Sequence, residues 1–149
     1  MSWALIPLTE EQRAIQQAAR DFARDELAPG IGDRDRDARF DAGVIPKLAA
    51  LGFLGMLLPE QYDGLGLDTC TYLVALEEIA AVDASVAVLM SVHNSLPTQM
   101  ILRYGSDEQR ARFLPGMARG EILGAFAPSE PRAGSDAAAL TTRATRDGE

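Results

Sequence analysis

The sequence has 149 residues, enough for one domain with a hydrophobic core, and 47% of them are hydrophobic while 24% are charged. Its net charge of −8 argues against nucleic acid as the main partner, because neutralising phosphates requires a basic surface. The single cysteine and single histidine exclude an intrachain disulfide and a structural zinc site, and they fit a reducing, cytoplasmic location. The first seven residues lack the basic and apolar regions of a signal peptide.

The first half of the chain predicts helices separated by polar loops. Residues 9–12 (Thr-Glu-Glu-Gln) form a capping box, which begins a helix expected to reach about Ala28. The alternating acids and arginines of residues 33–41 predict a solvated connector. A short helix is predicted from Val44 to Leu51, and residues 58–67, rich in Pro, Gly and Asp, predict a loop.

Three more helices are predicted before Gly120. The third begins at about Thr69, the fourth covers residues 84–104 with a kink at Pro97, and the fifth begins with the capping box of residues 106–109. Residues 84–102 carry no charge over a length that could cross a bilayer. The polar residues within them predict a buried helix and no membrane span.

The pattern changes after Gly120. The apolar run 122–127 predicts a buried strand, the alternating residues 141–146 predict a second one, and Asp147-Gly148 predicts a hairpin turn. One strand and half a hairpin cannot form a stable sheet. We therefore predict an all-α domain of about five helices over residues 1–121, followed over residues 122–149 by the truncated opening strands of a β domain.

The segment Phe126–Asp136 (Phe-Ala-Pro-Ser-Glu-Pro-Arg-Ala-Gly-Ser-Asp) is the strongest candidate for a binding loop. Its two prolines fix φ around Ser129, and Gly134 permits a close backbone approach. Asp136 is placed to cap a following turn, whose free N–H groups would suit a phosphate or pyrophosphate.

Two single residues are interpreted as structural. His93 is predicted to lie in the helical core or at its edge, with no identifiable partner and no role as a general base. Cys70 is predicted to be a small buried residue, because nothing places a base beside it to make it a nucleophile. No catalytic residue and no metal ligand is predicted in this chain.

The order of helices, the Pro59–Gly66 loop and the Ser129–Asp136 motif (Ser-Glu-Pro-Arg-Ala-Gly-Ser-Asp) resemble the acyl-CoA dehydrogenases, with weaker support from residues 90–96 and 104–109. This resemblance implies FAD-dependent oxidation of the Cα–Cβ bond of an acyl-CoA thioester, with electrons passing to electron-transfer flavoprotein. It also implies a homo-oligomer. The catalytic base of most members is a glutamate in a C-terminal bundle, and no position here corresponds to it.

The same resemblance implies which residues bind the ligands. Flavin would be contacted by five residues of the loop: Phe126, Pro128, Ser129, Gly134 and Ser135. Ser135 also matches a substrate contact, and Val88, Val92 and Leu96, which share one helix face, match the far end of the acyl pocket. Ordinary core packing is the alternative for these three. The sequence departs from the family pattern at Pro128, which has no backbone N–H, and at Arg132, which replaces a frequent glycine.

Two alternatives to an acyl-CoA dehydrogenase remain at this point. One is a catalytically inactive, stand-alone helical module that binds a partner. The other keeps the fold and changes the substrate or the oxidant, as in an acyl-carrier-protein dehydrogenase or an acyl-CoA oxidase.

Overall fold

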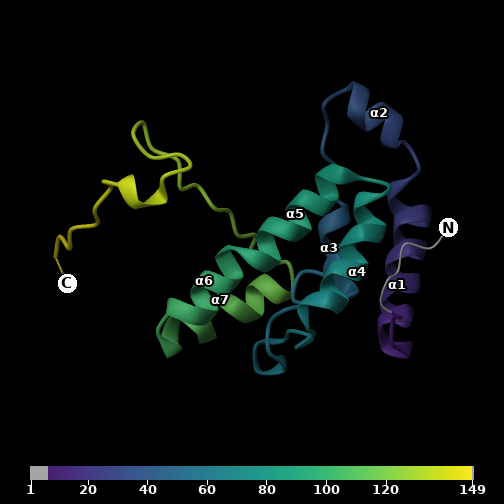
Figure 1. Cartoon of the computed structure of the whole chain (residues 1–149), viewed down its shortest axis with the longest axis horizontal. Coiled ribbons are helices and arrows are strands. Elements are labelled where there is room, and N and C mark those ends of the chain that lie inside the picture. The colour runs from purple at the N-terminus through teal and green to yellow at the C-terminus, as the bar shows by residue number, and fades with distance from the viewer. Residues whose placement is uncertain (1–6, 149) are drawn as a thin grey trace.

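The computed structural model describes residues 7–148, which form helices joined by loops (Figure 1). Most of the segment on which the absence of a signal peptide was predicted, residues 1–6, lies outside this description. No described helix is long and apolar enough to cross a membrane. The helices are α1 (Glu10–Phe22), α2 (Ile31–Arg36), α3 (Val44–Ala50), α4 (Thr69–Ala80), α5 (Ala84–Ser95), α6 (Pro97–Tyr104) and α7 (Asp107–Ala118), with a π-helical turn at Ala23–Leu27 and 3-10 turns at Glu60–Tyr62 and Ala137–Ala139.

The main core lies where α1, α3, α4 and α5 meet. Helix α1 begins at the predicted capping box, in which the Thr9 hydroxyl accepts from the Gln12 backbone N–H at 3.1 Å. The helix packs along α4, and its buried Phe22 meets Phe53 edge to face, with ring centroids 6.4 Å apart. At the rim, Arg20 donates two hydrogen bonds to Glu78. Helix α1 is therefore held against α4 by packing along its length and by this pair at the rim.

The stretch predicted as a solvated connector contains a short helix, α2. Its side chains are mostly exposed, but that of Arg34 reaches back to the end of the first helix. Arg34 donates to the carbonyl oxygens of Leu27 and of Pro29 (2.7 Å) and pairs with Asp83 at 3.4 Å. The exposed residues of the stretch agree with a solvated connector, but the prediction missed α2 and the contacts of Arg34, because these partners are set by the tertiary fold.

The loop predicted over residues 58–67 is confirmed, and it folds tightly back on the preceding segment. The backbone N–H of Gly66 donates to Leu58 O at 2.8 Å, and that of Leu67 donates to Met56 O at 2.9 Å. A Cβ at Gly64 would lie 2.1 Å from Leu58 O. Only glycine allows this close approach of two backbone segments.

The predicted kink at Pro97 is a break between two helices. Helix α5 begins at the N-cap Asp83 and ends at Ser95, and α6 begins at Pro97. Pro97 has no N–H, so it cannot donate to the carbonyl of His93. The fully buried hydroxyl of Thr98 lies 2.8 Å from that carbonyl oxygen and 2.7 Å from that of Asn94. A side chain thus replaces the backbone donor that proline lacks.

The all-α prediction is confirmed, whereas the two predicted strands are absent from the described residues. Between α7 and residue 148 the structure has one isolated bridge, between Glu130 and Ala133, and the 3-10 turn at Ala137–Ala139, but no strand. The apolar run 122–127 and the alternating run 141–146 find no partner strand within residues 7–148. A strand pattern needs such a partner to satisfy its backbone N–H and C=O groups, which explains the error.

Candidate functional site

The candidate loop begins where the chain leaves the helical domain after α7. Gly120 turns the chain with a φ of +70°, which favours glycine. Four residues later the backbone N–H of Gly124 donates to Nδ1 of His93 at 3.2 Å. Beyond this contact the segment runs away from the helices, and it is the yellow-green end of the ribbon in Figure 1. The loop is therefore attached to the domain through residues near Gly124.

A tight turn forms the centre of the loop. The backbone N–H of Glu130 donates to Ala133 O at 2.8 Å, and that of Ala133 donates to Glu130 O at 3.1 Å. Pro131 and Arg132 lie at the tip of this turn, and Ala133 is buried. The proline fixes φ at the position where the chain reverses.

The carboxylate of Glu130 ties this turn to a later segment. It accepts hydrogen bonds from the backbone N–H and hydroxyl of Thr141, at 2.8 and 3.0 Å, and from the backbone N–H of Thr142 at 3.0 Å. Hydrogen bonding to Thr142 and Thr141 lowers the pKa of Glu130 to about 2. The motif residue thus acts as a hydrogen-bond acceptor within the chain. Sequence inspection missed this contact because no local pattern links residues 11 positions apart.

The remaining loop residues present their polar groups to solvent. Phe126, Pro128, Ser129, Gly134 and Ser135 are all exposed. Within residues 7–148, the Ser129 hydroxyl and the backbone N–H groups of Ser129, Gly134 and Ser135 donate no hydrogen bond. Asp136 caps the following turn as predicted, because its Oδ1 accepts from the Ala138 N–H at 3.1 Å. The loop therefore has unpaired donors and an exposed aromatic ring.

The second predicted element is the helix face with Val88, Val92 and Leu96; the structure places Val88 and Val92 on α5, whereas Leu96 lies at the break between α5 and α6. Val88 is 61% exposed, and Val92 and Leu96 are half-buried. The opposite side of α5 carries the buried residues Met90 and Asn94. The core-packing alternative is therefore wrong for Val88, while its role in an acyl pocket stays a prediction.

The side chain of Asn94 connects α5 to the segment that precedes the loop of residues 58–67. Its Oδ1 accepts from the Met56 N–H at 3.1 Å, and its Nδ2 lies 2.8 Å from Phe53 O and 3.0 Å from Met90 O. All three bonds are buried. The bonds to Met56 and Phe53 fix the orientation of α5, the helix on which Val88 is exposed.

The lone histidine and lone cysteine differ from their predictions in one respect each. His93 is buried as predicted, at 1% exposure, but it has two partners, Met117 O and the Gly124 N–H. Cys70 is exposed, contrary to the prediction, because it lies in the first turn of α4 on the side away from the core. No group of three or more His, Cys, Asp or Glu residues able to hold a metal ion occurs within residues 7–148.

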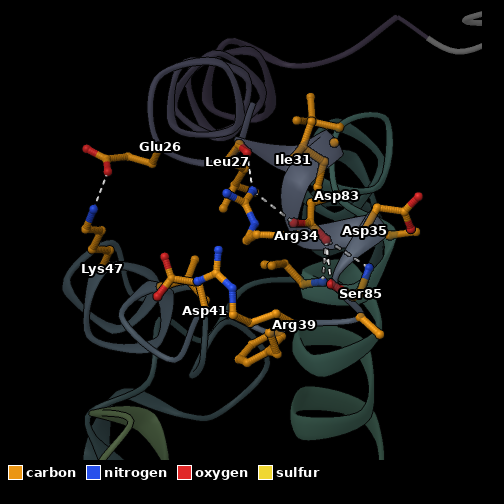
Figure 2. A pocket seen from close by; sticks show the side chains of 17 residues that line it. Glu26, Leu27, Ile31, Arg34, Asp35, Arg39, Asp41, Lys47, Asp83 and Ser85 are labelled. Atoms are coloured by element: carbon orange, nitrogen blue, oxygen red, sulfur yellow. Dashed lines mark hydrogen bonds and ion pairs between the residues drawn. The ribbon is translucent and has the colours of Figure 1, made fainter. Parts of the chain in front are cut away.

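A pocket of about 640 Å³ lies at the N-terminal end of α5, between α2 and α3 (Figure 2). Arg34 and Asp83 face each other inside it, and Ser85 hydrogen-bonds to Asp83 at 2.6 Å. Although burial acts to raise it, the pKa of Asp83 is lowered by hydrogen bonds from Ser85, Val86 and Arg34. None of the predicted site residues lines this pocket, and its two most buried charges already pair with each other.

The structure does not bring the two predicted elements together. Figure 1 shows the yellow C-terminal segment, which contains the turn Ala137–Ala139, extending away from α5. The exposed loop and the exposed face of α5 are thus two separate surfaces of the described chain. A site that uses both would need additional protein to bridge them.

Comparison with known proteins identifies the family. A sequence model of the acyl-CoA dehydrogenase N-terminal domain matches residues 9–121. The chain therefore belongs to the acyl-CoA dehydrogenase family, as the motifs of the loops indicated.

Similar proteins extend well beyond the length of this chain. An acyl-CoA dehydrogenase of Bacillus subtilis is 41% identical over 139 residues, covering 93% of this chain and 37% of the relative. Glutaryl-CoA dehydrogenase of Mycobacterium smegmatis, solved in complex with FADH2, has a TM-score of 0.88 and 35% identity over 95% of this chain and 36% of its own. A chain from a structural study of the electron transferring flavoprotein of Acidaminococcus fermentans has a TM-score of 0.85 and 38% identity, covering 93% of this chain and 36% of that one. This chain spans about a third of the length of these proteins.

The loop residues fit a flavin dinucleotide in their donor chemistry. Such a group accepts hydrogen bonds at its ring carbonyls and pyrophosphate, and the unpaired donors of Ser129, Gly134 and Ser135 are available for it. Apart from Gly134 and its two chain neighbours, no heavy atom lies within 4 Å of the place where a Cβ of Gly134 would be, so that backbone is open to close approach. Pro128 is the exception, because it has no N–H to donate.

Proposed function

We propose that this chain is the N-terminal part of a flavin-dependent acyl-CoA dehydrogenase, which oxidises the Cα–Cβ bond of an acyl-CoA thioester to the 2-enoyl-CoA. The observation that carries the proposal is the exposed loop after Gly124, which has unpaired donors and follows directly on the matched N-terminal domain of residues 9–121. FAD, when bound, would supply the acceptor for the β-hydride. Electrons would then leave to electron-transfer flavoprotein.

The residues of this chain would bind and orient the ligands. Phe126 would lie beside the flavin ring, and Ser129 would donate a hydrogen bond that stabilises negative charge on the reduced ring. Gly134 and Ser135 would contact the cofactor phosphates, and Ser135 also the substrate. The α-proton would be removed by a carboxylate that none of the described residues supplies.

The exposed face of α5 would hold the end of the acyl tail. Val88, Val92 and Leu96 carry no charge and no hydrogen-bonding side-chain group, which suits an aliphatic chain. Val88 is large, apolar and exposed, and such a residue on a fixed helix gains from being covered.

A chimaera tests this proposal. Residues 1–149 would replace the matching N-terminal part of the Bacillus subtilis relative, which supplies the rest of the enzyme. We expect the purified chimaera to show a flavin absorption spectrum and to oxidise an acyl-CoA with an artificial electron acceptor. The isolated chain is expected to do neither.

The controls separate a failed fold from a failed proposal. A chimaera that has helical circular dichroism and a cooperative thermal transition, yet holds no flavin, would refute the proposal and favour a stand-alone interaction module. If the chimaera oxidised an acyl-carrier-protein thioester and not an acyl-CoA, the proposed substrate would change to the carrier-protein thioester. Rapid reoxidation by oxygen would favour an oxidase.

A further inference from the structure

His93 occupies a position that connects three parts of the chain. It lies on α5, and its imidazole is 1% exposed. Its Nε2 is 3.0 Å from the carbonyl oxygen of Met117 on α7, and its Nδ1 is 3.2 Å from the backbone nitrogen of Gly124. No role in catalysis or ligand binding uses this side chain.

The two partners determine which ring nitrogen carries the proton. A carbonyl oxygen can only accept a hydrogen bond, so Nε2 must be the protonated nitrogen. Nδ1 is then unprotonated and accepts a hydrogen bond from the N–H of Gly124. Only the neutral ring with its proton on Nε2 makes both bonds, because a second proton on Nδ1 would face the Gly124 N–H donor.

Gly124 is held at this point by packing as well. A Cβ at residue 124 would lie 2.4 Å from Cγ of Pro97 and 2.7 Å from Cε of Met117. These atoms belong to α6 and α7, so the backbone of Gly124 passes through a gap that admits no side chain. The hydrogen bond to His93 fixes the direction of the Gly124 N–H, and the narrow gap between α6 and α7 restricts the position of the Gly124 backbone.

We infer that His93 is a positioning residue, which fixes the point where the flavin loop leaves the helical domain; this role of the loop rests on the proposed function. Phe126 follows Gly124 by two residues, and Ser129 follows it by five. An error in the position or direction of Gly124 is therefore carried directly to both predicted flavin contacts. His93 itself touches neither ligand.

Three substitutions separate the bond to Gly124 from the rest of the histidine. The side-chain oxygen of His93→Asn is as many bonds from Cβ as Nδ1 and can accept from Gly124. The side-chain amide of His93→Gln is as many bonds from Cβ as Nε2 and can reach only Met117. His93→Phe keeps a ring of similar shape and removes both bonds.

The test measures amide hydrogen exchange of Gly124 by NMR in the 149-residue chain. We expect exchange to accelerate about five- to tenfold in His93→Gln and His93→Phe, and to stay within about twofold of wild type in His93→Asn. Amides of α4 report the fold of each variant. Equal exchange of Gly124 in wild type, His93→Gln and His93→Phe would overturn the assignment.

A second measurement needs no variant, so a substitution that unfolds the chain does not block the test. Ring ¹⁵N shifts of wild-type His93 at pH 7.5 are expected to show a neutral ring with the proton on Nε2 and a hydrogen-bonded Nδ1. A proton on Nδ1 would overturn the assignment. Neither readout involves flavin, so a chimaera that fails to hold FAD would refute the proposed function and leave this result standing.

In a chimaera that does hold FAD, the variants also test the consequence for the loop. His93→Gln is expected to weaken flavin binding several-fold, and His93→Asn to restore it. Equal flavin affinity in the two variants would show that the contact at Gly124 does not position the loop.

Discussion

The hydroxyl of Thr98 lies 2.8 Å from the carbonyl oxygen of His93, the atom that Pro97 leaves without a helical donor. The proline that breaks the helix is thus followed directly by the residue that compensates for the break. His93 consequently has a satisfied backbone at the position where its side chain contacts Met117 and Gly124. The helix break and the imidazole contacts belong to one buried cluster.

Removing the Thr98 hydroxyl should destabilise this cluster. Thr98→Val keeps the volume and leaves two buried carbonyl oxygens with one donor fewer, so we expect a loss of about 1–3 kcal/mol in the free energy of unfolding. Thr98→Ser retains the hydroxyl and should lose less. Urea denaturation of the three chains measures this, and equal stability of wild type and Thr98→Val would contradict it.

Asn94 should be the most sensitive polar residue of α5. Asn94→Ala removes the partners of the Met56 N–H and the Phe53 carbonyl in a buried place, so we expect a loss of about 2–4 kcal/mol in unfolding free energy. The neighbouring exposed Ser95→Ala serves as the control, with a change of about 0.5 kcal/mol or less. Similar melting curves for the two variants would show that the Asn94 bonds are not required.

Acidification should weaken the fold through His93. Burial lowers the pKa of His93 below its ordinary 6.5, although the hydrogen bond to Met117 acts to raise it. The unfolded chain therefore binds a proton at a higher pH than the folded chain. The stability contributed by the neutral ring is fully present above pH 6.5 and declines as the pH falls below that value.

His93→Asn isolates this contribution, because it has no ring to protonate. We expect the difference in unfolding free energy between pH 7.5 and pH 5 to be smaller in His93→Asn than in wild type, measured by denaturant titration. The carboxylates titrate equally in both chains and cancel in the comparison. An identical pH dependence would mean that His93 titrates normally in the fold.

The Glu130 contact should persist in moderate acid. Because the pKa of Glu130 is lowered to about 2, its carboxylate should hold Thr141 and Thr142 at pH 4 and release them as the pH approaches 2. The amide shifts of Thr141 and Thr142 in an NMR titration report this directly. A midpoint near the ordinary value of 4.5 would contradict the contact. Glu130→Gln should abolish the titration, whereas Glu121→Gln should not.

The same substitution should leave stability nearly unchanged at Val88 and lower it strongly at Met90. Val88→Gln replaces an exposed side chain, so stability should change by about 0.5 kcal/mol or less, while Met90→Gln buries an unpaired amide and should cost about 2–4 kcal/mol. In the chimaera, Val88→Gln should lower kcat/KM for a long-chain acyl-CoA about tenfold and spare a short one. An equal effect on both substrates would remove Val88 from the acyl site.

Local signals predicted most of the helical fold. The capping boxes of Thr9 with Gln12 and of Ser106 with Gln109 mark the starts of α1 and α7, and the break at Pro97 follows from the missing N–H. Helix α2 was missed because its fixed point, Arg34, pairs with a residue 49 positions away. The predicted strands failed because an alternating pattern alone does not provide a partner.

The sequence located the candidate loop by its residue types, but it did not predict which distant residues the loop and His93 contact. The Ser-Glu-Pro motif indicated the loop, but the partners of His93 are 24 and 31 positions distant in the sequence. Cys70 was misjudged because its position on α4 relative to the core depends on how that helix packs. Contacts between distant segments were the part that sequence patterns could not supply.

The bonds from Glu130 to Thr141 and Thr142 close residues 131–140 into a ring. Residues 125–129 connect this ring to the helices. Docking it onto another protein layer would orient one preformed body and would not require ordering each of its residues separately, so the entropy cost is smaller than for an open segment of the same length. The number of residues in the ring is also fixed by these bonds. Inserting or deleting a residue between Glu130 and Thr141 would break the hydrogen bonds to Glu130 or shift them to other residues.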